Sequence, residues 1–168
     1  QIVADEVVAT LVAGTLANDG ELREENGRWE IVGDPTEVSL IVAARKVKAD
    51  RKIKRYTRVG EIPFTSERKR MSIIAKDSTD SDKLTVFAKG APDVLLSYCT
   101  RIRVGGQVRK LTEGDRQSIL ATVERLSSEA YRTLGEACRP LETSSLADVP
   151  GVSVNAAGQV SDIADQAE

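Results

Sequence analysis

Histidine is absent from this chain of 168 residues, and several other features that carry chemistry are scarce. Without imidazole, the sequence excludes Ser-His and Cys-His nucleophile pairs, imidazole metal sites and a histidine general base. Its longest unbroken apolar run, Leu40 to Ala44, is far shorter than the roughly 20 residues that a membrane-spanning helix needs. No signal peptide is expected, because Gln1 leads directly into a short acidic segment without a basic start. The two cysteines, Cys99 and Cys138, stand in no metal-ligand spacing and are expected to be reduced thiols.

Aromatic residues make up only 4% of the chain, but apolar residues reach 40% and charged residues 30%. These fractions are typical of a folded globular protein, and the length suits about one domain. Positive charge is concentrated in the middle, where residues 45–70 hold eleven Lys or Arg and three acids. Residues 1–44 and 140–168 are acidic, and the second of these segments has no base. The basic middle indicates either an anionic ligand or a solvated surface, and charge alone does not separate the two.

The order of apolar and turn residues predicts an α+β fold: a twisted antiparallel sheet flanked by helices. Turn signals at Asn26-Gly27 and Gly105-Gly106 predict two hairpins. Thr112 with Asp115 predicts a capping box at the start of a long helix. The expected helices cover 3–17, 35–49, 92–98 and a segment from 112 onward, and the expected sheet strands cover 55–62, 71–76, 84–89 and 131–137. We expect one domain over 1–139, followed at 140–168 by an acidic loop or tail rich in Ser, Gly and Ala.

Searches for familiar phosphate and metal loops give no match. Neither G-x-x-x-x-G-K-[ST] nor G-x-G-x-x-G occurs among the twelve glycines. The spacing Asp77-x-x-Asp80-x-Asp82 resembles the start of a calcium loop, but it lacks the central glycine and the terminal glutamate. We therefore interpret it as a solvated loop and predict neither a catalytic residue nor a metal site in this chain.

Three other segments carry residue types that suit a nucleotide: Gly33–Glu37, Pro63–Ser72 and Phe87–Pro92. Phe64 offers an exposed ring, and Met71 a polarisable thioether, on which a planar base can stack. Lys69 and Lys89, with the neighbouring arginines, provide positive charge for phosphates, and Glu37 can accept a hydrogen bond from an exocyclic amine. Taken singly, each of these residues has an ordinary structural explanation, such as a core aromatic or a surface lysine.

Together and in this order, the three segments resemble the nucleotide-binding (N) domain of P-type cation-transporting ATPases of the calcium-pump-like class. The matching patterns are Gly-Asp-Pro-Thr-Glu, Phe-x-Ser-Glu-Arg-Lys-Arg-Met-Ser and Lys-Gly-Ala-Pro. A fourth segment, Tyr131–Ala137, resembles the family strand that carries an arginine after the long helix. The resemblance covers roughly residues 1–139. Heavy-metal pumps of the same superfamily bind adenine around a Ser-Glu-His-Pro motif, which a chain without histidine cannot contain.

The resemblance implies a role for each matching residue. Phe64 would stack on adenine, Met71 would pack beside the ring, and Glu37 would recognise the amino edge of the base. Lys89, followed by Gly90, would lie at the floor of the pocket. Ser66 stands where many relatives have an arginine, and Arg68 or Arg70 is the candidate substitute. The complete set of ATP-binding residues implied in this way is Glu37, Phe64, Ser66, Lys69, Met71, Lys89, Gly90 and Arg132, with Lys69 and Arg132 meeting the ribose and phosphates.

The family's phosphorylated aspartate lies in Asp-Lys-Thr-Gly-Thr, and neither this motif nor the family's Gly-Asp-Gly-x-Asn-Asp segment occurs here. The resemblance therefore implies a domain that binds Mg-ATP without turning it over. The γ-phosphate would be presented to the aspartate of a separate phosphorylation domain, which would also hold most of the magnesium coordination. The implied partners are ATP and the phosphorylation and actuator domains of a parent pump, and the implied location is the cytoplasmic side of the cell membrane.

Two other classes of function stay open at this point. One is a non-catalytic regulatory module whose basic surface, residues 45–70, docks an acidic protein. The other is a nucleic-acid binder, which the sequence pI near 5.4 argues against. We expect no nucleic-acid partner, no membrane insertion of this segment, and a monomer in isolation.

Overall fold

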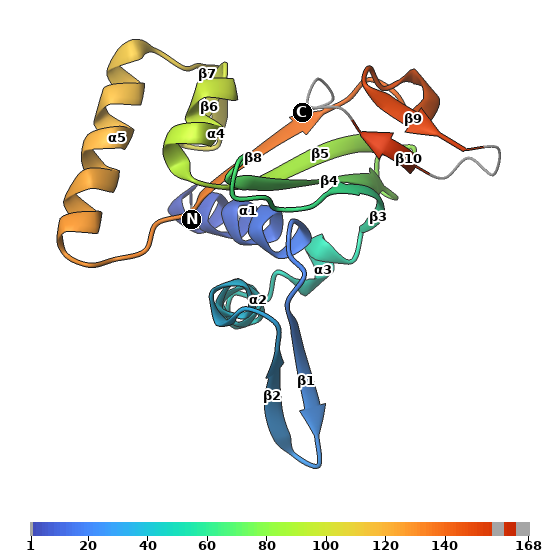
Figure 1. Ribbon diagram of the computed structural model, residues 1–168, viewed down its shortest axis with the longest axis horizontal. Helices are drawn as coiled ribbons and strands as arrows, with labels where there is room; N and C mark the ends of the chain where they lie inside the picture. Colours follow the sequence, from blue (N-terminus) through green and yellow to red (C-terminus); the bar gives the residue numbers. More distant parts are fainter. Residues whose placement is uncertain (1, 156–159, 164–168) are drawn as a thin grey trace.

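The computed structural model describes residues 2–155 and 160–163 and has a four-stranded antiparallel sheet at its centre (Figure 1). The strand order is β3-β4-β5-β8, and every neighbouring pair is antiparallel. These strands are β3 (Tyr56–Ile62), β4 (Arg70–Asp77), β5 (Lys83–Gly90) and β8 (Gly135–Pro140). With helices packed around the sheet, the architecture confirms the predicted α+β class.

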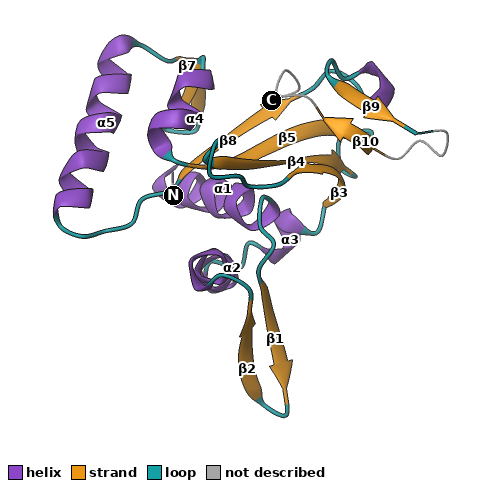
Figure 2. Cartoon of the chain, in the orientation of Figure 1, coloured by secondary structure: helices purple, strands orange, loops and turns teal. Residues whose placement is uncertain are grey.

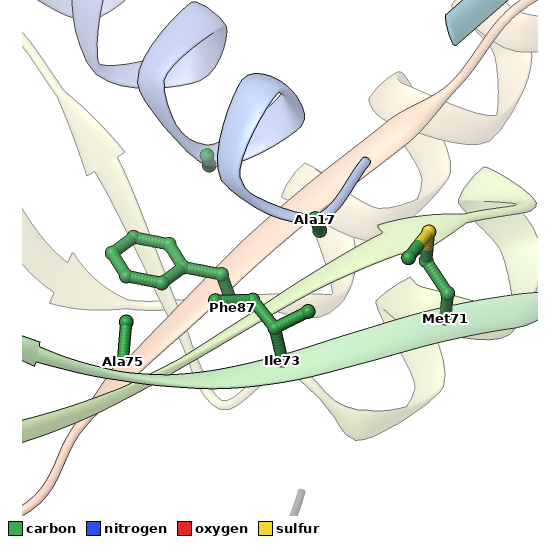
Figure 3. Packing of buried hydrophobic residues seen from close by; sticks show 6 residues of the cluster. Ala17, Met71, Ile73, Ala75 and Phe87 are labelled. Atoms are coloured by element: carbon green, nitrogen blue, oxygen red, sulfur yellow. The ribbon is translucent and has the colours of Figure 1, made fainter. Parts of the chain in front are cut away.

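Helix α1 (Ile2–Leu16) lies across one face of the sheet and closes its main core (Figures 1 and 3). Side chains of a strand alternate between faces, so every second residue of β4 turns toward α1. The resulting apolar cluster is buried, and Tyr56 and Phe87 meet edge to face in it with ring centroids 5.0 Å apart. Its buried members are Ala13, Ala17, Met71, Ile73, Ala75 and Phe87.

The opposite face of the sheet holds a second buried cluster, and the chain beyond Pro140 contributes to it. Its members are Ile74, Leu84, Val86, Leu141 and Val149. The chain continues through a 3-10 turn, Leu146–Asp148, and the antiparallel strands β9 (Val152–Val154) and β10 (Val160–Ile163). The expectation of a loop or tail throughout 140–168 is therefore wrong for these strands. Val152 of β9 packs against the second cluster. Residues 156–159 and 164–168 lie outside the described part, and a domain boundary at 139 stays a prediction.

Helix α2 (Pro35–Lys46) and the short helix α3 (Asp50–Ile53) lie beside α1. Asp34 caps α2 by accepting a hydrogen bond from the Thr36 amide at 2.6 Å, as its position before a proline suggests. The expected helix over 35–49 is shorter than predicted, since Lys48 adopts the left-handed region (φ 56°) and interrupts it. The hairpin of β1 (Glu21–Glu25) and β2 (Arg28–Val32) confirms the turn signal and projects from the body (Figure 2).

Helix α4 (Pro92–Tyr98), the hairpin of β6 (Arg101–Val104) and β7 (Gln107–Lys110), and helix α5 (Glu113–Ser128) connect β5 to β8. The capping box between Thr112 and Asp115 is confirmed, with both reciprocal hydrogen bonds present. The strand expected over 131–137 is wrong in its first half, because β8 begins only at Gly135. Ala130 has a left-handed backbone (φ 63°) that ends α5, and the Tyr131 amide still donates to the Leu126 carbonyl. Residues 131–134 consequently form the loop that reverses the chain from α5 into the sheet.

A candidate nucleotide site at one end of the sheet

The segments singled out by the sequence converge at one end of the central sheet. Met71 pairs with Lys89, and Arg70 pairs with Gly90, so the loop before β4 lies beside the end of β5. Lys89 in turn pairs with Glu136, which brings the start of β8 to the same place. Antiparallel pairing thus unites sequence positions that are more than sixty residues apart.

Lys89 and Glu37 form the charged centre of this site. The Lys89 ammonium lies 2.6 Å from Glu37 Oε1, and the lysine side chain is 6% exposed against 22% for the glutamate. Glu37 stands in the first turn of α2, where the helix dipole favours a carboxylate. The cation is nearly buried and the carboxylate is partly exposed. Its second oxygen, Glu37 Oε2, accepts a hydrogen bond from the Asp19 amide at 3.3 Å, so both carboxylate oxygens already have a partner. The structure therefore brings together two residues that the resemblance implied for an adenine pocket, Glu37 for the amino edge and Lys89 for the floor.

Asn18 holds this pair in place, and the sequence reasoning missed it. Its side-chain amide donates to the carbonyl of Glu37 (2.9 Å) and to that of Gly14 (3.2 Å), while its own oxygen accepts from the Gly20 amide (2.8 Å). Asn18 thereby ties the end of α1 to the start of α2. In the sequence, Asn18-Asp19-Gly20 directly follows the helix expected over 3–17, and these residues indicate only the end of that helix.

Glu136 is a second carboxylate beside Lys89 and was also missed as a site residue. Gly14 allows its approach, because a Cβ on Gly14 would lie 2.1 Å from Glu136 Oε1. Burial raises the pKa of Glu136 from its ordinary value of 4.5 to about 7, although a backbone hydrogen bond at Gly14 and the charge of Lys89 pull it downward. The other oxygen, Oε2, is buried without a hydrogen-bond partner. The site therefore contains a carboxyl that titrates near neutral pH in a chain without histidine.

Phe64 lies in the exposed loop between β3 and β4 and is 58% exposed. The loop is shaped by its own hydrogen bonds: Lys69 N donates to the Thr65 carbonyl at 2.8 Å, and Arg68 N donates to Thr65 Oγ1 at 3.2 Å. Ser66 is exposed in the turn of this loop. An aromatic ring exposed on a hydrogen-bonded loop is a suitable stacking surface for a base.

Gly90 has a packing role that explains the glycine directly. A Cβ at this position would lie 2.4 Å from the Lys69 carbonyl oxygen, so only glycine lets β5 approach the loop. The same carbonyl accepts a hydrogen bond from Ala91 N at 2.9 Å, and Lys69 itself has a left-handed backbone (φ 52°). Lys69 is thus fixed at its backbone while its side chain stays exposed.

Met71 and Arg132 differ in their exposure. Met71 is 2% exposed and belongs to the core cluster under α1 (Figure 3), so its thioether is not exposed to a base, contrary to the expectation that it would pack beside the ring. Arg132 is exposed and donates to Thr36 Oγ1 at 3.0 Å, which places a guanidinium beside the start of α2. The Asp34 carboxylate has a lowered pKa, chiefly because it accepts a hydrogen bond from the Thr36 amide, with a smaller contribution from Arg132.

Arg70, one of the two candidate substitutes for the arginine missing at Ser66, lies elsewhere. It is only 4% exposed and stacks over the Tyr98 ring at 4.3 Å. Because it precedes Met71 on β4, it turns to the opposite face of the sheet. Arg68 stays with the loop, where its side chain donates to the Pro63 carbonyl at 3.2 Å. The expectation that either arginine serves this site is therefore corrected, and only Arg68 remains a candidate.

An antiparallel four-stranded sheet covered by α1, with charged residues gathered at one strand end, defines an α+β domain with a candidate polar site. No helix in residues 2–155 or 160–163 is long and apolar enough to cross a membrane. Among those residues we also find no group of three or more metal-ligating side chains.

Comparison with known families assigns the domain. The profile described as "P-type ATPase, cytoplasmic domain N" matches residues 6–167, which extends past the segment covered by the motifs. The chain therefore belongs to the P-type ATPase N-domain family.

Individual relatives agree with this assignment. The chain is 38% identical over 128 residues to a probable cation-transporting ATPase F of Mycobacterium tuberculosis, covering 74% of this chain and 14% of the relative. It is 33% identical over 134 residues to a calcium-transporting ATPase of Bacillus subtilis (79% and 15%) and 35% identical over 133 residues to calcium-transporting ATPase 1 of Bacillus cereus (78% and 14%). The chain thus spans about one seventh of the length of these relatives, and its similarity is to the calcium-pump-like class.

Proposed function

We propose that this domain binds ATP for a cation-transporting P-type pump and presents the γ-phosphate to a catalytic aspartate outside this chain. One observation supports this most directly: four separate segments place an exposed aromatic ring, a buried Lys89–Glu37 pair and two exposed cations at one sheet end. The ring suits adenine, and the cations suit a polyphosphate. The relatives' names add cation transport as the process that the bound nucleotide would serve.

In the proposed binding mode, adenine stacks on Phe64 and its amino group donates to Glu37 Oε2, alongside the Asp19 amide that donates to the same oxygen at 3.3 Å. Lys89 orients that carboxylate, because its Nζ already lies 2.6 Å from Glu37 Oε1. Lys69 and Arg132 meet the ribose and phosphates from the rim, and Gly90 lets the loop close against β5. Ser66 contributes only a short hydroxyl, so Arg68 is the remaining source of a guanidinium from that loop.

This chain supplies binding and orientation, while the chemistry belongs to the rest of the pump. ATP brings Mg²⁺ with it, and we propose that a separate phosphorylation domain holds that ion. Closure of the two domains would then carry the γ-phosphate to the aspartate. Because the isolated domain lacks those contacts, we expect a dissociation constant on the order of 0.1–1 mM.

The test separates stacking from charge. Phe64→Ala is expected to abolish detectable binding of both adenosine and ATP, whereas Lys69→Ala is expected to weaken ATP at least several-fold and leave adenosine unchanged. Trp29→Ala, at an exposed aromatic of the projecting hairpin, and Lys110→Ala are the matched controls. The measurement is an amide chemical-shift titration that follows Glu37 and Lys89.

Two outcomes would count against the proposal. Millimolar ATP that leaves the amide signals of Phe64, Glu37 and Lys89 unmoved in a folded sample would remove the site. If both variants lose affinity for adenosine and for ATP to the same extent, the proposed site would stand. The separate roles of the Phe64 ring and the Lys69 charge would be overturned.

The alternative of a basic docking surface has less support. Arg55 pairs with Asp77 at 3.1 Å, and Arg58 pairs with Asp19 at 3.0 Å and with Glu61. Two of the eleven basic residues of 45–70 are therefore paired within the domain, which reduces the attraction of this surface for an acidic protein.

A further inference from the structure

A second pocket lies on the face of the sheet turned away from α1. Its volume is about 430 Å³, which is within the range of small-molecule sites. Strands β5 and β8 supply an apolar floor that includes Val86 and Ala88, and helix α4 supplies Leu95. The segment that follows α4 closes one side with Cys99, and β8 contributes Cys138.

Among the described residues, the charged side chains that line this pocket are all basic. They are Arg70, Arg101 and Arg139. Arg103 adds to this field, because its charge acts on the Cys138 thiol and lowers a pKa that burial raises. Such an arrangement is unexpected in a chain with a formal net charge of −2, where acidic side chains are available to neutralise arginines.

Two of these arginines can donate hydrogen bonds to a bound anion. Within the described ranges, Arg101 and Arg139 take part in no ion pair, although other exposed arginines of the domain do. Arg70 is oriented from below by its stacking on Tyr98. Guanidinium groups bind the oxygens of phosphate, sulfonate or carboxylate in paired hydrogen bonds, so these anions are the usual ligands of arginine.

From this geometry we propose that the pocket binds an organic anion, with its acidic head between Arg101 and Arg139 and its apolar body on the floor of Val86 and Ala88. The pocket is separate from the ATP site, because Arg70 and Met71 are consecutive on β4 and turn to opposite faces. An ordinary phosphate ion would satisfy the arginines but would leave the apolar floor uncovered. The ligand class is therefore an acid carrying a hydrocarbon or aromatic group.

The chain provides its own reporters of occupancy, because both of its cysteines line this pocket. The probe is 8-anilinonaphthalene-1-sulfonate, and its uncharged counterpart N-phenyl-1-naphthylamine tests the need for the acid. Iodoacetamide labelling of Cys99 and Cys138, followed by mass spectrometry, reports whether the probe covers the thiols. We expect the sulfonate to bind with enhanced fluorescence and to slow labelling at least threefold, and the neutral compound to do neither.

Variants locate the binding. Arg101→Gln with Arg139→Gln is expected to weaken the sulfonate at least tenfold, while Arg28→Gln with Arg51→Gln, the same charge change at remote exposed positions, leaves it unchanged. Circular dichroism verifies that both double variants are folded. Saturating ATP is expected to leave labelling of the thiols unchanged.

Three results would overturn the proposal. The first is equal protection by the neutral compound, and the second is unaltered sulfonate binding in the Arg101 and Arg139 variant. The third is displacement of the sulfonate by ATP together with its loss in Phe64→Ala, which would place the probe in the nucleotide site. None of these results would count against ATP binding, so the two proposals fail separately.

Discussion

Glu136 makes the stability of this domain depend on pH in a range where most proteins respond through histidine. Its pKa is about 7 in the folded protein and near 4.5 when the chain is unfolded. The folded state therefore holds its proton more tightly, and the free energy of unfolding falls as pH rises from about 4.5 to 7. Above pH 7 both states are ionised at this carboxyl, and the loss is complete.

The size of the effect follows from the difference between the two pKa values. A tenfold change in proton affinity is worth about 1.4 kcal/mol, so a pKa higher by about 2.5 corresponds to about 3 kcal/mol in total. Between pH 5 and pH 8 the free energy of unfolding is expected to decrease by about 2.5 kcal/mol. For a domain of this size the midpoint of thermal unfolding should fall by about 5–10 °C over the same interval.

Urea unfolding followed by circular dichroism at pH 5, 6, 7 and 8 measures this slope. Glu136→Gln keeps the shape of the side chain and removes the titration, so its curve should be nearly flat over this interval. Glu124→Gln, at an exposed position of α5, should keep the slope of the original protein. Because the chain has no histidine, no imidazole obscures the measurement. A flat profile in the original protein, or an equal slope in Glu136→Gln, would refute the burial of a titrating carboxyl against Gly14.

Other predictions concern packing and capping. Ile73→Ala should lower the free energy of unfolding in urea by about 2–5 kcal/mol, because Ile73 is fully buried under α1. Val108→Ala, at an exposed hairpin position, should change it by no more than about 0.5 kcal/mol. Similar costs for both variants would contradict the position of the core. Thr112→Ala should remove about 1 kcal/mol from α5, seen as faster amide exchange in that helix, and since α5 buries none of its residues the global melting temperature should move little. Lys89→Met should weaken ATP binding, because it removes the nearly buried charge that contacts Glu37. The fold should persist, because Glu37 is partly exposed and can be hydrated without its partner. An unchanged affinity for ATP would refute the role of the pair.

Local signals predicted the elements well where they depend on neighbouring residues. The capping box at Thr112, the hairpin at Asn26-Gly27 and the three central strands are set by short-range chemistry, and the structure confirms them. The errors occur where a contact distant in sequence decides. The start of β8 was placed too early because Ala130, in a left-handed conformation, extends the reversal after α5. The strands after Pro140 were missed because few of their residues are apolar. The packing of Val152 depends on a cluster on the second face of the sheet, which periodicity does not reveal.

Resemblance to a family selected the residues of the candidate site, and register explains why they meet. What the sequence could not show is which neighbours hold them: Asn18 fixes Glu37, and Gly14 admits Glu136. Gly14 lies in α1 and Asn18 just after it, and both contact residues farther along the chain. Periodicity identifies the buried stripe of a helix, but it does not reveal which strand end the helix terminus will reach.

The run Arg68-Lys69-Arg70 shows how strand alternation divides one cluster of charge between two sites. In the sequence the three cations form a single basic patch after Phe64, and all three seemed available to a polyphosphate. The structure ends the loop at Lys69 and begins β4 at Arg70, so Arg70 turns away from Met71 and toward Tyr98. Shifting the start of β4 by one residue would exchange their faces, placing a guanidinium beside Lys89 and a thioether among the arginines of the second pocket. The left-handed backbone of Lys69, held by Gly90, fixes that register, and with it the separation of the two sites.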